Sequence, residues 1–202
     1  MNVSAENRRL VFIFPSHKLA IHCTPKAGFT SMKTACMATL GLTGSARGKG
    51  LLLTWEEVPD DYVAVASVRH PVDRAISLWV NGVRDQPRRF SPGLAAIGIH
   101  PGMGFRDFVE RLADGWPDDH HAAPQSTLFD PWADCGHTLR LLKFNKLGTE
   151  WEKLRKDYPL LAGLPHMNMS DPSAKRSAYS DLESIDILKC LYSRDMEEFG
   201  FG

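Results

Sequence analysis

The sequence predicts an α/β domain with a mainly parallel central sheet flanked by helices. Two apolar runs, Leu19 to Cys23 and Tyr62 to Val68, carry this prediction. Short, valine- and isoleucine-containing runs without strict alternation are typical of strands buried on both faces, as in parallel sheets. Each run is soon followed by a proline and then by apolar residues at helical spacing, so two strand–turn–helix units are expected.

The other elements follow from shorter patterns of the same kinds. Strands are predicted at 11–14, 19–23, 51–54, 62–68 and 139–144. Helices are predicted at 31–40, 71–83, 104–113, 149–158 and 182–199, from apolar positions three and four residues apart. We expect Gly41 to end the first of these helices.

The stretch Pro25-Lys26-Ala27-Gly28-Phe29-Thr30-Ser31 joins the first buried strand to the first helix. Gly28 allows the main chain to approach a ligand closely, and Thr30 or Ser31 is expected to cap the helix. A helix N-terminus presents N–H groups and the positive end of its dipole. With the charge of Lys26 beside it, the stretch predicts a site for a phosphate-like anion.

A nucleoside triphosphatase loop has a different pattern, G-x-x-x-x-G-K-[ST]. In this chain Lys26 precedes Gly28, and the first glycine of that pattern is missing. The Lys–Ser/Thr pair that serves the phosphates and Mg²⁺ is therefore absent. On this stretch alone, an ordinary strand–loop–helix connection with a surface lysine remains the alternative.

A second motif, Arg69-His70-Pro71-Val72-Asp73-Arg74-Ala75-Ile76-Ser77, follows the strongest predicted strand. Arg69 is expected at the carboxyl edge of the sheet, where open α/β sheets bind ligands. Its guanidinium group suits a phosphate, and Ser77 offers a hydroxyl. Asp73, Arg74 and Ser77 are predicted to lie opposite the apolar stripe of the helix. The alternative is a local Arg69–Asp73 ion pair with Ser77 in solvent.

Together the two motifs resemble those of the carbohydrate-type, family 2-like sulfotransferases. The first is similar to the 5′-phosphosulfate loop P-K-x-G-[TS]-[TS], with one residue inserted before the hydroxyl pair. The second is similar to the family's 3′-phosphate signature, an arginine at a strand end with a serine eight residues on. The resemblance covers roughly residues 19–199 and implies a P-loop-like sulfotransferase fold.

The resemblance implies 3′-phosphoadenosine-5′-phosphosulfate (PAPS) as the donor and 3′-phosphoadenosine-5′-phosphate (PAP) as the product. The donor-binding residues it implies are Pro25, Lys26, Ala27, Gly28, Phe29, Thr30, Ser31, Arg69 and Ser77. It also divides the single domain, residues 1–202, into a donor-binding core at about 11–83 and 138–202 and an acceptor-site insertion at about 84–137.

Within the insertion, His121, Pro124 and Gln125 match the family's H-x-x-P-Q segment. Imidazole titrates near neutral pH, so we expect His121 to be the general base and Lys26 to be the catalytic cation. His120 is the alternative base, and a solvated pair of loop histidines is the alternative to any catalytic role. His22 and His70 are weaker candidates, since one lies in a buried strand and the other beside the predicted 3′-phosphate site.

Two further segments resemble the family less completely. Leu164 to Ser170 is similar to an L-P-H-x-N-x-S segment, so Asn168 and Ser170, with Gln125, are possible secondary site residues. Asn145 stands where the family commonly has an acidic residue, which is the one hint of a non-catalytic relative.

Composition restricts the partners. The 24 basic and 24 acidic residues cancel, which argues against general nucleic-acid binding. We expect no membrane span and no signal peptide, and the widely spaced cysteines read as reduced thiols of a cytoplasmic, bacterial-type soluble enzyme. The spacing of His120, His121, Cys135 and His137 is not that of structural zinc, so no metal is expected. Oligomeric state cannot be read from the sequence.

The sequence therefore predicts metal-free, in-line transfer of a sulfuryl group from PAPS to an acceptor hydroxyl of a carbohydrate or small metabolite. Two other readings remain open. One is a P-loop-like nucleotide kinase that binds ATP and Mg²⁺, and the other is a non-catalytic nucleotide-binding protein on the same fold.

Overall fold

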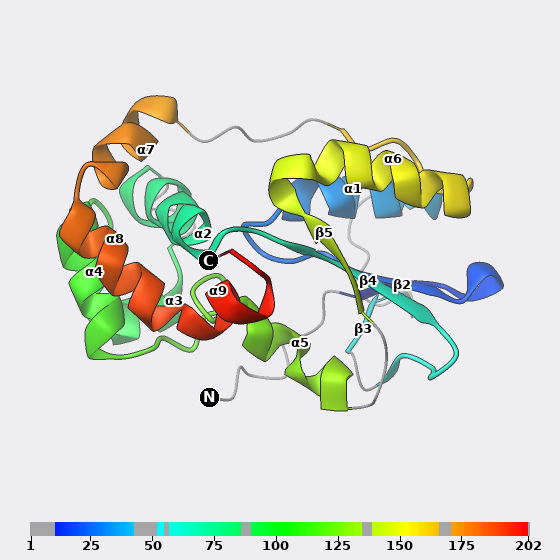
Figure 1. Cartoon of the computed structure of the whole chain (residues 1–202), viewed down its shortest axis with the longest axis horizontal. Helices are drawn as coiled ribbons and strands as arrows, with labels where there is room; N and C mark the ends of the chain where they lie inside the picture. The colour runs from blue at the N-terminus through cyan, green and yellow to red at the C-terminus, as the bar shows by residue number, and fades with distance from the viewer. Residues whose placement is uncertain are drawn as a thin grey trace. The chain divides into compact units, whose positions relative to one another are not determined.

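The computed structural model describes residues 11–42, 52–54, 57–85, 90–134, 139–165 and 171–201 (Figure 1). Within these ranges the strands are β1 (Val11–Phe14), β2 (Leu19–His22), β3 (Leu52–Leu53), β4 (Val63–Val68) and β5 (Leu139–Lys143). The α-helices are α1 (Phe29–Thr39), α2 (Pro71–Leu78), α3 (Pro92–Ala96), α4 (Phe105–Asp114), α5 (Gln125–Asp134), α6 (Leu147–Asp157), α7 (Pro172–Tyr179), α8 (Leu182–Leu191) and α9 (Ser193–Glu198). Shorter helical turns are η2 (Pro15–His17), η4 (Trp79–Arg84, a π-helix) and η6 (Phe144–Lys146).

The strands form one sheet in the order β3-β1-β2-β4-β5. The inner strand β4 runs parallel to both β2 and β5, with Ile21 opposite Val65 and Val65 opposite Arg140. The tight turn at η2 returns the chain from β1 to β2, so β1 pairs antiparallel with β2 and with the short β3. Parallel neighbours need a crossover, and α1 lies in the crossover from β2 to β4. The predicted α/β class, with parallel strands at the predicted site, is confirmed.

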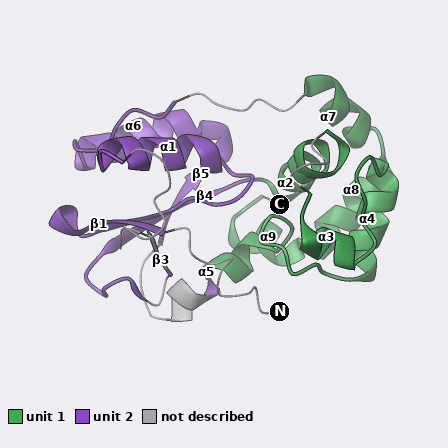
Figure 2. Ribbon diagram, turned by 180° about the vertical axis from the view of Figure 1, so that it is seen from behind, with its two compact units in different colours: residues 1–4, 70–128, 169–202 green, residues 5–69, 129–168 purple. Residues whose placement is uncertain are grey.

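The chain divides into two compact units, coloured separately in Figure 2. Unit 1 comprises residues 1–4, 70–128 and 169–202, and unit 2 comprises residues 5–69 and 129–168. The boundary at residue 69 falls directly after β4 and Arg69.

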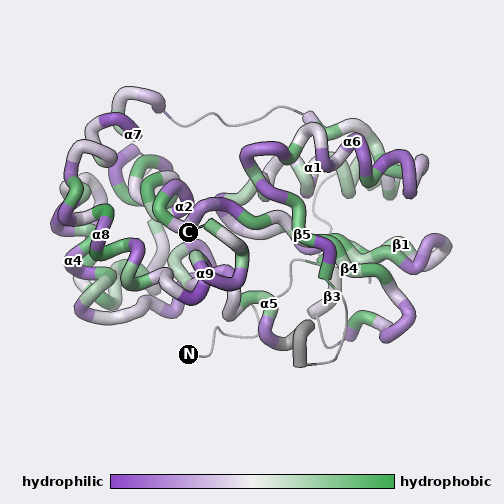
Figure 3. The backbone as a smooth tube through the Cα atoms, viewed as in Figure 1, coloured by the Kyte–Doolittle hydropathy of each residue, from purple (hydrophilic) through white to green (hydrophobic). Residues whose placement is uncertain are grey.

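Unit 2 contains the sheet, with α1 and α6 side by side on one of its faces (Figures 1 and 2). Residues of β1, β2 and β4 pack there against both helices. The buried members of this core are Phe12, Phe14, Leu19, Ile21, Cys23, Met32, Ala35, Cys36, Val65, Leu142, Leu147, Trp151, Leu154 and Leu161. Figure 3 shows hydrophobic residues gathered along the central strands, with hydrophilic residues on α6. This packing fixes the start of α1 at the end of β2.

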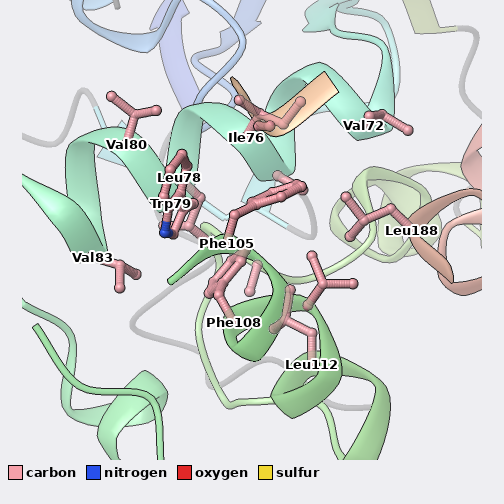
Figure 4. Close-up of a cluster of buried hydrophobic side chains, with 14 of the residues drawn as sticks. Val72, Ile76, Leu78, Trp79, Val80, Val83, Phe105, Phe108, Leu112 and Leu188 are labelled. Carbon is pink, nitrogen blue, oxygen red and sulfur yellow. The ribbon is translucent and has the colours of Figure 1, made fainter. Parts of the chain in front are cut away.

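Unit 1 has a second core, built by helices. In Figure 4, Phe105, Phe108 and Leu112 of α4 pack with Ile76 of α2 and Leu188 of α8. Trp79 of η4 joins them and donates its indole N–H to the Met103 carbonyl at 2.9 Å. No helix of the described ranges is long and apolar enough to cross a membrane.

Three helix predictions were wrong in detail. Thr30 and Ser31 lie inside the first turn of α1, and Gly28 is its N-cap. Arg74 and Ser77 of α2 are only 1% and 5% exposed, because unit 1 packs around the whole of α2. The closing helix is two helices, α8 and α9, which meet at Tyr192.

Candidate functional site

The predicted anion loop is a tight turn between β2 and α1. The Ala27 N–H donates to the Thr24 carbonyl at 3.1 Å, which closes the turn. Lys26 has a φ of 63° and Gly28 a φ of 91°, so both lie in the left-handed region. Since Gly28 has no side chain, α1 begins without a side-chain cap. Its first-turn N–H groups, at Phe29, Thr30 and Ser31, therefore face the turn in the manner of anion sites at helix N-termini.

Gly28 is required here for two reasons. Its positive φ is one that only glycine adopts without cost. A Cβ at this position would lie 2.5 Å from Cδ2 of Leu147, the first residue of α6. The loop is therefore shaped both by its own turn and by close packing against α6.

Arg69 lies directly after β4, at the predicted carboxyl edge, and is 6% exposed. Its Nη1 donates to the Lys26 carbonyl at 3.0 Å, and its guanidinium carbon lies 4.6 Å above the centre of the Phe144 ring. Arg69 is thus part of the loop's own structure, because it donates a hydrogen bond to the carbonyl of Lys26, a left-handed residue of the turn. Lys26 and Arg69 bring two cations to this loop.

Ser77 belongs to unit 1, where it is buried on α2 and its carbonyl accepts a hydrogen bond from Asn81 at 3.2 Å. Its assignment to the 3′-phosphate remains a prediction from the spacing to Arg69. Gln125 is fully buried, and its N–H and side-chain amide both donate to Asp195 Oδ2, at 2.7 and 3.4 Å. Asn168 and Ser170 lie outside the described residues.

His121 lies in a turn before α5, with its side chain 38% exposed. Asp119 Oδ1 accepts the His121 main-chain N–H at 2.6 Å and lies 3.1 Å from His121 Nδ1. Asp119 itself is only 3% exposed. Burial opposes ionisation of its carboxyl, but hydrogen bonds from His121 and Ser91 outweigh this and hold the pKa of Asp119 well below its ordinary value.

This contact gives His121 a defined orientation. When Nδ1 carries the proton that points to Asp119, Nε2 is the unprotonated nitrogen. The His120 ring lies 4.0 Å away from the His121 ring, centre to centre. An Asp–His dyad of this kind can accept a proton at Nε2.

The other histidines and the substituted acid have simpler surroundings. His22 is buried in β2, as expected, with Nδ1 3.1 Å from Thr24 Oγ1 and its ring packed edge-on against Phe129. Asn145 is exposed in the turn after β5, next to the Phe144 ring under Arg69.

One set of side chains in the described ranges could hold a metal ion: the potential ligand atoms of Asp119, His120 and His121 lie within 4.8 Å of one another. Cys135 and His137, the other residues considered from the sequence, lie outside the described ranges. Asp119 Oδ1 already accepts two contacts from His121, so the arrangement is described more fully by the dyad.

No role of Asp119 was expected from its sequence, because only the folded turn brings its carboxylate against His121. The same is true of Arg74, Tyr192 and Asp195, which contact the same turn from distant parts of the chain. Nothing in their local sequence marks them. Only the fold of unit 1 brings them to residues 119–126.

Comparison with known proteins agrees with the fold. The family model described as "Sulfotransferase family" matches residues 9–202, so the chain belongs to the sulfotransferase family and to its class of transferases. No curated protein and no solved structure matches the chain.

Proposed function

We propose that the chain transfers a sulfuryl group from PAPS to the hydroxyl of a carbohydrate or small metabolite. The observation that carries the proposal is the loop of residues 24–31, where the N-terminus of α1, the left-handed main chain of Lys26 and the buried Arg69 meet. Family membership supplies the reaction class, and these donors suit the phosphosulfate end of PAPS.

Lys26 and the start of α1 are assigned to the leaving side of the reaction. When the S–O bond to the donor breaks, negative charge accumulates on the 5′-phosphate oxygens. Preformed N–H groups and a cation stabilise that charge more in the transition state than in the ground state. Lys26 thus serves as a catalytic cation, and Thr30 and Ser31 as hydroxyl donors in the same turn.

His121 is assigned to the attacking side. The acceptor hydroxyl must lose its proton as its oxygen bonds to sulfur, and His121 Nε2 takes that proton. Asp119 keeps the other ring nitrogen protonated and offsets the positive charge that forms on the ring. No step of this scheme requires a metal ion.

The donor is tested first by ligand stabilisation. PAP at one hundred times its Kd should raise the unfolding free energy by about 2.7 kcal/mol, because it binds only the folded chain. ATP and ATP·Mg²⁺ should give much smaller shifts. A larger shift with ATP·Mg²⁺ than with PAP would favour the nucleotide kinase instead.

Lys26→Ala then tests catalysis against binding. We expect turnover of PAPS with an acceptor pool to fall by about 10²–10³, the usual loss for one transition-state donor, while PAP affinity falls much less. Lys153→Ala, an exposed lysine of α6 in the same unit, is the matched control and should retain activity. Equal losses of turnover and affinity would make Lys26 a binding residue only. PAP binding without any turnover of the wild type would favour the non-catalytic reading.

A further inference from the structure

The turn that carries His121 is held in place mainly by hydrogen bonds between its main-chain groups and side chains from other parts of unit 1. Three of its carbonyls are bonded by buried side chains: Arg74 Nη2 donates to the His120 carbonyl at 2.9 Å, and Arg74 Nη1 to the Ala123 carbonyl at 2.6 Å. The Tyr192 hydroxyl donates to the Ala122 carbonyl between them at 2.7 Å.

The donors at the other end of the turn are bonded as well. Asp195 accepts the Gln125 N–H on Oδ2 at 2.7 Å and the Ser126 N–H on Oδ1 at 2.8 Å, and so caps α5 from another helix. Within the turn, the N–H groups of Ala122 and Ala123 donate to the Asp119 carbonyl at 3.0 and 2.9 Å. Many main-chain polar groups of residues 119–124 are thus bonded, although these residues belong to no strand or helix.

The groups that make these contacts are unusual for their burial. Arg74 is 1% exposed, Tyr192 1% and Asp195 0%. Burial lowers the pKa of Arg74, while the nearby Tyr192, Asp195 and Asp119 oppose that change. Burying an arginine costs free energy of folding unless the charge is paired. A shorter apolar side chain would fill the same core at a lower cost in free energy. Arg74 nevertheless suits this position, because its planar guanidinium group donates to two carbonyls of one turn at the same time.

We propose that Arg74, Tyr192 and Asp195 are positioning residues that fix the His121 turn so that its imidazole stays against Asp119. None of the three needs to touch substrate. The inference rests on the proposed function for its kinetic consequence, but the positioning itself is a statement about the His121 ring in the free protein.

The variants are chosen so that the chain still folds. Tyr192→Phe removes only the hydroxyl that bonds the Ala122 carbonyl. Arg74→Lys keeps the buried charge but cannot bridge two carbonyls. Tyr179→Phe makes the same chemical change at a 41% exposed tyrosine of α7 and is the matched control. Thermal unfolding first shows which variants are folded at the assay temperature.

The first readout is the ring itself. In protein labelled with ¹⁵N-histidine, we expect His121 of the wild type to show the Nδ1-protonated tautomer, and folded Tyr192→Phe and Arg74→Lys to show tautomer averaging. Tyr179→Phe should match the wild type. An unchanged His121 signature in both folded variants would overturn the proposal, whether or not the protein turns over PAPS.

The second readout is kinetic. Small displacements of a catalytic group can cost about 10²-fold in rate, so we expect kcat to fall between about 10- and 100-fold in both variants, with PAP affinity within about twofold of wild type. Full activity in Tyr192→Phe and Arg74→Lys, when His121→Ala is inactive, would overturn the positioning role alone. An inactive wild type would instead overturn the proposed function, and the ring signature would still decide the inference.

Discussion

At the scale of single residues, Arg69 has more than one task. The sequence placed it at a strand end for a phosphate, and the structure adds a bond to the Lys26 carbonyl and a stacking contact with Phe144. A lysine could not make both contacts, because it lacks the planar fork. Arg69 therefore links the shape of the anion loop to any role in reading the donor.

Arg69→Ala separates the two tasks. A charge-assisted hydrogen bond to phosphate is worth about 1.5–3 kcal/mol, so PAP should bind roughly 10–150-fold more weakly. An analogue without the 3′-phosphate should change by less than about threefold, as measured by calorimetric titration. Similar losses for both ligands would show that Arg69 only supports the loop.

Substitution of each of the two neighbouring histidines tests which one is the base. His121→Ala removes the ring that faces Asp119 and should reduce turnover by about 10²–10⁴, with PAP affinity unchanged. His120→Ala is the matched control and should cost far less. Steady-state kinetics with saturating PAPS compare the two, and a larger loss in His120→Ala would move the base by one residue.

At the scale of elements, the sequence was most informative where the signal is local. The apolar runs of β2 and β4 and the glycine after α1 predicted their elements directly. Arg74 was placed on a solvent face because a charge in an amphipathic pattern normally lies there. Its burial depends on a turn 46 residues away and on α8, which no local pattern contains.

The close packing of the anion loop against α6 can be tested by substituting Gly28. Gly28→Ala combines a strained φ with a Cβ that would lie 2.5 Å from Leu147, so we expect a loss of more than about 2 kcal/mol in urea unfolding. Gly41→Ala has a similar positive φ but open space around it, and should lose only the strain, about 1–2 kcal/mol. Equal losses of unfolding free energy in the two variants would mean that Leu147 of α6 moves aside for the added Cβ at no measurable cost.

At the scale of the whole molecule, the chain keeps the predicted anion loop and the His121 turn in different units with separate cores. The sequence motifs point to candidate residues in each unit. They could not predict how the His121 turn is built, since its supports come from α2, from Tyr192 between α8 and α9, and from α9, and meet it only after unit 1 has folded.

Acid stability offers a molecule-wide check on the dyad. The pKa of Asp119 is lower in the folded chain than in the unfolded one, so its contribution is complete above an unfolded pKa of about 3.9 and is lost as pH falls below that value. Asp119→Asn should therefore be less stable than wild type at pH 7, with the gap closing toward pH 2. A gap that stays constant with pH would exclude the ionised carboxylate as its source.

The residues that hold the His121 turn also determine when this turn can form during synthesis of the chain. Asp119 and His121 leave the ribosome long before Tyr192 and Asp195, which bond the Ala122, Gln125 and Ser126 main chain. Until residue 195 has emerged, the turn has neither its cap at α5 nor its central hydroxyl. A nascent chain could therefore pack the anion loop against α6 as soon as residues 144–157 have emerged, but it could complete the His121 turn only some forty residues later.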